Sequence, residues 1–210
     1  MKGLPVSTRS VPPPPVFGEP MPLGAVTPEV LAFLARRRSA SAMTLRAPAP
    51  NAAELADLIR LAARVPDHGK LFPWRFVVIE GAAKDALVAR LTQQAQALPN
   101  AAKALAALGK LSIPPMSVAV ISRVAPDAAI PVWEQQLSVG AVCQTFLIAA
   151  EAMGFGANWI TDWYAYEPEA VALLNLAPHE RVAGFIHIGT PGEAPAERVR
   201  PDLDKIVSRL

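Results

Sequence analysis

Stretches with the helical period of apolar positions alternate along this chain with short runs of continuously apolar residues. The first pattern predicts helices, and the second predicts buried strands. We expect helices over 27–37, 51–65, 84–98, 101–108 and 132–153, and a short one beginning near 167. We expect strands over 75–80, 116–122, 158–161 and 182–188. Strands distributed among helices in this order are compatible with the α+β and α/β classes, and the pattern alone does not choose between them.

Two of the expected helices carry specific start signals. Thr27 stands before Pro28, which predicts a capping residue followed by a proline in the first turn. Asn51 is followed three residues later by Glu54, which is the spacing of a capping box. Pro66 then ends the second helix, because proline cannot continue a helix.

The stretch 132–153 predicts the longest helix, and it has apolar residues almost all round. A helix of that kind is buried on most sides, so we expect it at the centre of the core or of a subunit interface. It does not read as a membrane span, because the most apolar stretch, 138–160, contains Gln144, Glu151 and glycines.

The composition points to a large buried area. Hydrophobic residues make up 52% of the chain and charged residues only 18%. No apolar segment typical of a signal peptide follows Lys2, and we expect no membrane association. The surplus of apolar surface is best explained by contact with a second copy, since obligate dimer interfaces resemble a domain core cut in half.

Charge and cysteine content exclude several classes of function. The net charge of +2 arises from 20 basic and 18 acidic residues that are spread along the chain, so a clustered nucleic-acid-binding face is not expected. Cys143 is the single cysteine, which excludes a disulfide within the chain and suits the cytoplasm. The three histidines have no spacing typical of metal ligands. We therefore expect neither metal nor nucleic acid.

Proline-rich sequence separates the first residues from the rest of the chain. Residues 1–26 contain the run Pro12 to Pro15 and three further prolines, and such sequence favours extended geometry. It is either a disordered leader or an arm that wraps a partner subunit. Residues 27–210 read as a single domain without internal repeats. Gly154-Phe155-Gly156 follows a helix and precedes a strand, which is the wrong order for a Rossmann fingerprint.

Two basic clusters are candidates for binding a phosphate. Arg37, Arg38 and Ser39 end the first helix, and planar guanidinium groups suit phosphate. The alternative is a basic helix end that complements the helix dipole. Arg198 and Arg200 alternate in an extended tail, so both can face the same way, although a solvated surface pair explains them equally well.

Two loops complete the candidate chemistry. Arg64 and His68 flank the end of the second helix, in a proline-punctuated loop of the kind that often builds a ligand site. Trp159, Ile160 and Thr161 follow a glycine pair that permits close backbone approach, and they could lie along a flat aromatic ligand. A turn followed by a core strand is the plainer interpretation of that second segment.

The ordered set of motifs resembles the nitroreductase family of FMN flavoproteins, most closely its small-subunit branch. The resemblance covers about residues 31 to 191. It is carried by Arg-Arg-Ser-Ala-Ser at 37–41, Val-Pro-Asp-His at 65–68, Pro-Trp-Arg-Phe at 73–76, Trp-Glu-Gln at 133–135, Gly-Phe-Gly at 154–156 with Trp159, and Gly-Phe at 184–185 running to Gly-Thr-Pro at 189–191.

This resemblance implies an α+β homodimer with a central, mostly antiparallel sheet flanked by helices and two FMN molecules at the subunit interface. Positions matching the family's flavin contacts are Arg37, Arg38, Ser39, Arg64, His68, Trp159, Ile160 and Thr161, and the tail pair Arg198 and Arg200 matches a basic pair that holds the phosphate in other branches. The segment 149–154 matches one assigned to nicotinamide binding.

The implied activity is electron transfer from NADH or NADPH through FMN to a small-molecule acceptor, by a ping-pong mechanism with no catalytic side chain. An oxygen-dependent flavin-cleaving enzyme and a non-catalytic FMN-binding dimer remain alternatives. Phe72, Ile160 and Ser41 replace polar residues that are common in the family, so the resemblance does not extend to the substrate class.

Overall fold

A single five-stranded sheet organises the chain in the computed structural model, which describes residues 9–210. The strands are β1 (Leu45–Arg46), β2 (Trp74–Glu80), β3 (Met116–Arg123), β4 (Gly156–Ile160) and β5 (Glu180–Pro191). Their order is β1-β5-β3-β2, and β4 pairs with β5 as well. Every pair is antiparallel, which confirms the expected α+β class and sheet type.

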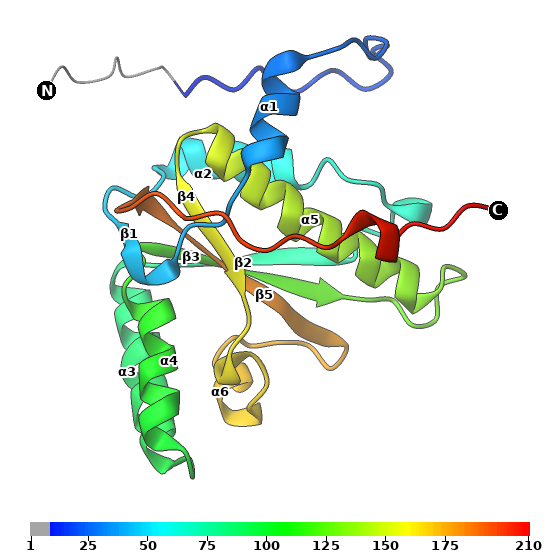
Figure 1. Cartoon of the computed structure of the whole chain (residues 1–210). Helices are drawn as coiled ribbons and strands as arrows, with labels where there is room; N and C mark the ends of the chain where they lie inside the picture. The colour runs from blue at the N-terminus through cyan, green and yellow to red at the C-terminus, as the bar shows by residue number, and fades with distance from the viewer. Residues whose placement is uncertain (1–8) are drawn as a thin grey trace, which may run out of the picture.

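Helices cover both faces of this sheet (Figure 1). They are α1 (Pro28–Arg36), α2 (Ala52–Ala62), α3 (Gly81–Ala97), α4 (Ala101–Ser112), α5 (Val132–Ala152) and α6 (Pro168–Ala172). Short 3-10 turns occur at Ala42–Thr44, His68–Lys70, Trp163–Ala165 and Leu203–Lys205. The expected helices and strands are all present within a few residues of the positions that the sequence pattern predicts.

The side chains of β3 show how one strand serves two cores. Met116, Val118 and Val120 face the cluster built with α2 and α5. Ala119 and Ile121 face the opposite cluster, which includes side chains of α3, α4 and α6. Because successive strand residues point to opposite faces, a continuous apolar run is what a strand covered on both faces requires.

Helix α5 is the main support of the first core. Nine of its 21 residues are buried, among them Val139, Val142 and Phe146. At 1.5 Å per residue it is about 30 Å long. Trp133 and Leu137 lie on its other side and are 67% and 54% exposed. The helix is therefore buried against the sheet and presents large apolar side chains outward.

Both expected helix starts are present, but only one of the two expected capping bonds forms. The Asn51 side chain accepts hydrogen bonds from the backbone of Ala53 and Glu54, and Glu54 accepts one from the Asn51 backbone, so the capping box is complete. Thr27 makes no capping bond, because its hydroxyl donates to the carbonyl of Ala25 instead. The two-residue strand β1 was not expected, since so short an element has no readable period.

The N-terminal segment that the structure describes begins on the body of the domain and then leaves it. Arg9 pairs with Glu54 at 3.0 Å and lies over the ring of Phe155, and Arg60 donates to the carbonyl of Pro12. Further along, α1 buries none of its residues, and it projects from the body in Figure 1. Part of the predicted tail, residues 1–8, lies outside the described residues. Disordered or partner-wrapping behaviour of the tail stays a prediction.

The described residues bear on two further features, a membrane-spanning helix and a metal site. Across residues 9–210, no helix is long and apolar enough to cross a membrane. The same residues contain no group of three or more histidine, cysteine or acidic side chains arranged to hold a metal ion.

His187 is a buried titratable group in the second core. It is fully buried on β5, and its Nδ1 lies 2.8 Å from the hydroxyl oxygen of Ser117 on β3. Burial, together with the positive charges of Lys84 and Lys110, lowers the pKa of His187 to about 3. The native protein therefore keeps this imidazole neutral throughout the mildly acidic range.

We expect this histidine to make the fold sensitive to acid. As the pH falls from about 6.5 towards 3, the unfolded chain binds a proton that the native chain does not, so the free energy of unfolding drops by up to about 1.4 kcal/mol per pH unit. The His187→Gln variant should lose this slope in the upper part of the window, where carboxylates are still ionised. Urea unfolding at a series of pH values measures it, and equal slopes in the two proteins would contradict the assignment.

Candidate functional site

The segment between α1 and β1 is fastened to the free side of β4. The backbone N–H of Ala40 donates to the carbonyl of Ala157 at 3.0 Å. The side-chain amide of Asn158 donates to the carbonyl of Ala40 at 2.5 Å. These bonds place Arg37, Arg38 and Ser39 beside the start of β4, although more than a hundred residues separate the two segments in the sequence.

Gly156 makes this close approach possible. A Cβ at this position would meet a methyl of Leu45 at 2.7 Å, the Cβ of Ala40 at 3.0 Å and the Cβ of Pro191 at 3.1 Å. Real Cβ atoms essentially never come within 3.0 Å of another heavy atom. Only glycine therefore lets the three segments converge on the start of β4.

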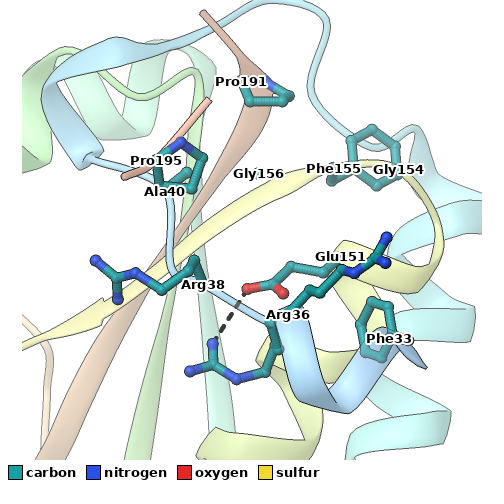
Figure 2. Close-up of a pocket in the computed structure, with 11 residues that line it drawn as sticks. Phe33, Arg36, Arg38, Ala40, Glu151, Gly154, Phe155, Gly156, Pro191 and Pro195 are labelled. Atoms are coloured by element: carbon teal, nitrogen blue, oxygen red, sulfur yellow. Dashed lines mark hydrogen bonds and ion pairs between the residues drawn. The ribbon is translucent and has the colours of Figure 1, made fainter. Parts of the chain in front are cut away.

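A basic pocket of about 360 Å³ lies at this junction. Arginines from the end of α1 line it together with two aromatic rings and backbone from the glycine turn; the lining residues are Phe33, Arg36, Arg37, Arg38, Ala40, Glu151, Gly154, Phe155, Gly156, Pro191 and Pro195. In Figure 2 the carboxylate of Glu151 lies among the arginine side chains and is joined to one of them by an ion pair. Three guanidinium groups against one carboxylate leave an excess of positive charge, which favours an anion.

Glu151 holds Arg37 from the last turn of α5. The Arg37 Nη1 and Glu151 Oε1 atoms are 3.3 Å apart, and their side chains are only 17% and 13% exposed. Burial raises the pKa of Glu151, whereas the charges of Arg37 and Arg38 lower it. A negative group is unfavourable at a helix C-terminus, so the arginines supply the compensating charge. The sequence did not predict Glu151 as a partner of Arg37, although Glu151 lies in the segment 149–154 that the resemblance matches to nicotinamide binding.

A second, adjoining pocket of about 780 Å³ is formed with the C-terminal tail. Its lining combines the end of the arginine cluster with the tail; the residues are Arg38, Ser39, Ala40, Ser41, Asn158, Glu193, Ala194, Pro195, Ala196, Glu197 and Arg198. Arg38 Nε donates to the carbonyl of Ala196 at 2.9 Å, which ties the tail to the cluster. Arg198 thus lines the same pocket as Arg38 and Ser39.

Arg200 lies outside this lining. Its Nη2 atom pairs with Glu197 at 3.0 Å, and both side chains are well exposed, at 47% and 60%. The backbone N–H of Arg198 donates to the same carboxylate at 2.6 Å. Within one chain, only the first of the two tail arginines faces the pocket.

Trp159 and Ile160 lie on β4 and Thr161 follows it, and none of the three lines either pocket. The Trp159 indole donates to the carbonyl of Ala183 at 3.3 Å and remains 37% exposed. The Thr161 hydroxyl accepts a hydrogen bond from Tyr166 at 2.9 Å. Trp159 and Ile160 share β4 with the arginine-bearing junction, and Thr161 follows directly after the strand.

Arg64 and His68 lie elsewhere, near the other end of α5. His68 Nδ1 is 2.7 Å from an oxygen of Glu134, which is in the first turn of α5. A small pocket of about 270 Å³ opens beside them, lined by Pro66, His68, Glu134, Leu137, Ser138 and Ala141. The Arg64 side chain is exposed and makes no hydrogen bond to any residue in 9–210.

Helix α5 therefore separates the expected contacts into two groups. One group contains Arg64 and His68, and its His68 pairs with Glu134. The other group contains Arg37, which pairs with Glu151. The helical rise puts Glu134 and Glu151 about 25 Å apart. Within one chain, the structure brings together Arg37, Arg38, Ser39 and Arg198, and it does not bring Arg64 and His68 to them.

Comparison with known proteins relates this chain to nitroreductases. Residues 34–190 match the sequence model of the Nitroreductase family. The chain is 32% identical over 164 residues to the Escherichia coli K12 protein named "Putative NAD(P)H nitroreductase YdjA", covering 78% of this chain and 88% of that one. It is 33% identical over 172 residues to a "Putative NAD(P)H nitroreductase" of Haemophilus influenzae, covering 81% and 92%.

Solved structures share the fold at lower identity. A nitroreductase-like protein from Bacillus cereus superposes with a TM-score of 0.74 at 22% identity, covering 90% of this chain and 99% of that one. A protein from Desulfovibrio desulfuricans, described as a "putative nitroreductase in complex with fmn", has a TM-score of 0.68 at 20% identity, covering 89% and 98%.

Proposed function

We propose that this chain, which belongs to the nitroreductase family, uses FMN to pass electrons from NADH or NADPH to a small oxidised acceptor. The support in the structure is the basic junction at the end of α1, where two adjoining pockets are lined by four arginines and three glutamates. The ligand chemistry that fits it is a phosphate carried by a longer, partly aromatic molecule.

The donor set fits the phosphate end of FMN. Arg38, Ser39 and Arg198 line the larger pocket, and Arg37 lies beside them. Guanidinium groups make paired, charge-assisted hydrogen bonds to phosphate oxygens, and a serine hydroxyl adds a neutral donor. The negative charge of a phosphate would balance the positive charge that Glu151, Glu193 and Glu197 leave uncompensated. The ring system would extend along β4 past Trp159, Ile160 and Thr161.

The remaining expected contacts require a second copy of the chain. A flavin mononucleotide is shorter than the span of about 25 Å between the two ends of α5, so it cannot touch Arg37 and His68 of the same chain. Two α5 helices that cross near their middles in an antiparallel arrangement, with the two-fold axis across the helices, would bring the start of one helix beside the end of the other. Arg64 and His68 of one copy would then complete the site begun by Arg37 of the other.

The exposed side of α5 suits such a contact. Its outward residues form a stripe at helical spacing that is mostly apolar or small, namely Trp133, Leu137, Gly140, Ala141, Gln144 and Ile148. Gly140 has no heavy atom within 4 Å of the position where a Cβ would be, and it lies near the middle of the helix. A two-fold contact uses the same patch on both copies, and small central residues let the two helices approach closely.

When bound in this site, FMN would supply the redox chemistry, namely acceptance of a hydride from the nicotinamide and transfer of two electrons to the acceptor. The side chains of this chain bind and orient it. The arginines and Ser39 fix the phosphate, β4 supports one side of the ring, and the loop with Arg64 and His68 approaches from the second copy. Nicotinamide and acceptor would use the same cleft in turn, which gives ping-pong kinetics.

Anaerobic titration tests this function directly. Protein loaded with FMN should be yellow, and NADH or NADPH should bleach its absorbance near the flavin maximum, with recovery when an oxidised acceptor is added. Protein that takes up no FMN, or bound FMN that neither nicotinamide bleaches, would contradict the proposal. The second outcome is the one that a non-catalytic FMN-binding dimer gives.

The phosphate assignment gives a quantitative prediction for Arg37. Hydrogen bonds to charged groups contribute about 1.5–3 kcal/mol, so Arg37→Ala should weaken FMN binding by about tenfold to a hundredfold. Because this change also leaves Glu151 without its partner, the double variant Arg37→Ala/Glu151→Gln should be measured beside it. Arg60→Ala is the control, since Arg60 pairs with Asp57 on α2. Unchanged affinity in both Arg37 variants would remove Arg37 from the site.

A further inference from the structure

The loop that carries His68 is held in place by contacts on both sides of the histidine. The Ser138 hydroxyl of α5 donates to the carbonyl of Pro66 at 2.6 Å. The Asp67 carboxylate accepts the backbone N–H of Phe72 at 2.8 Å. The backbone positions of residues 66 to 72 are thereby fixed relative to the first turns of α5.

The His68 ring itself is held by Glu134. Nδ1 lies 2.7 Å from Oε2 of the carboxylate. An ionised carboxylate only accepts hydrogen bonds, so the ring nitrogen that faces it must carry the hydrogen. Nε2 is then the ring nitrogen left to interact with something else. The hydrogen bond made by one nitrogen of a histidine sets the state of the other.

Glu134 itself has a fixed position at the start of α5. It is in the first turn of the 21-residue α5, where the helix dipole favours negative charge. Its neighbour Gln135 is buried and bonds the carbonyls of Ala125 and Ile130 and the backbone N–H of Ala125. The start of the helix is therefore anchored, and the carboxylate has a defined position.

This pair is too exposed to matter much for folding. The His68 and Glu134 side chains are 64% and 44% exposed, and surface ion pairs contribute little to stability. Its effect is on orientation, because it selects one ring nitrogen to face Glu134 and releases the other. The two side chains line the same small pocket beside the exposed stripe of α5.

We propose that Glu134 is a positioning residue for flavin recognition. It holds His68 in the Nδ1–H tautomer, so that Nε2 accepts a hydrogen bond from the imide N–H of an isoalloxazine ring bound in the cleft. The inference rests on the proposed function, because it takes FMN as the ligand. It adds a residue on α5 that sets which hydrogen-bonding group the loop presents.

The test compares Glu134→Ala with Gln136→Ala, a matched change at an exposed position on the same helix. Nitrogen-15 spectra of the histidine rings in FMN-free protein report the tautomer. His187 is buried, so His68 and His179 are the two accessible rings to assign. We expect Nδ1–H at His68 in wild type and in Gln136→Ala, and a shift towards Nε2–H in Glu134→Ala.

FMN affinity supplies the second measurement. Loss of a correctly oriented acceptor should weaken binding about twofold to tenfold in Glu134→Ala, since one neutral hydrogen bond contributes about 0.5–1.5 kcal/mol. Glu134→Gln, whose amide oxygen can still accept from Nδ1, should restore part of the affinity. In a His68→Ala background, Glu134→Ala should have no further effect, because its role acts through the ring.

The outcomes separate this inference from the proposed function. If wild-type protein binds no FMN, the proposed function is contradicted, and this inference then has no ligand. Normal FMN binding in wild type, with the same tautomer and affinity in Glu134→Ala as in Gln136→Ala, overturns the role of Glu134 alone. An equal loss of affinity on adding Glu134→Ala to His68→Ala also overturns it, because the carboxylate would then act without the histidine.

Discussion

The length and rigidity of α5 determine how a ligand site can be built on this fold. The helix lies against the sheet through a continuous row of buried side chains, so its two ends cannot approach each other. One end carries Glu134 and the other carries Glu151, and each holds a different member of the expected site. Because these positions are about 25 Å apart, we propose that each chain carries two separate half-sites. A second copy would convert them into two complete sites.

Electrostatics at the end of α1 gives one of these half-sites its chemistry. Arg36, Arg37 and Arg38 face a carboxylate that is partly desolvated and at the unfavourable end of a helix dipole. Glu151 is the counter-ion of Arg37. With three arginines and one glutamate in its lining, the pocket keeps a net positive charge. The close packing around Gly156 holds this cluster against β4, where a long ligand can run from the charged junction along the strand.

The sequence predicted the elements and the family well, because those depend on local signals. The period of apolar residues located the helices, and Asn51 with Glu54 predicted a capping box that the structure contains. The position of Arg37 relative to His68 could not be predicted from the sequence, because it depends on how α5 crosses the sheet. Glu134 and Glu151 were missed as partners of His68 and Arg37 for the same reason. Each is an ordinary acidic residue in sequence and gains its role from the side chain packed beside it.

Complementation between two defective chains is the most direct measurement of the central claim. Arg37→Ala chains and Arg64→Ala/His68→Ala chains should each bind FMN weakly as homodimers. In mixed dimers, one of the two sites receives wild-type residues from both chains, so unfolding and refolding the two proteins together should restore tight FMN binding to that site. If the mixture binds no more FMN than the two proteins refolded separately, the site does not combine these residues across two chains, and the account is wrong.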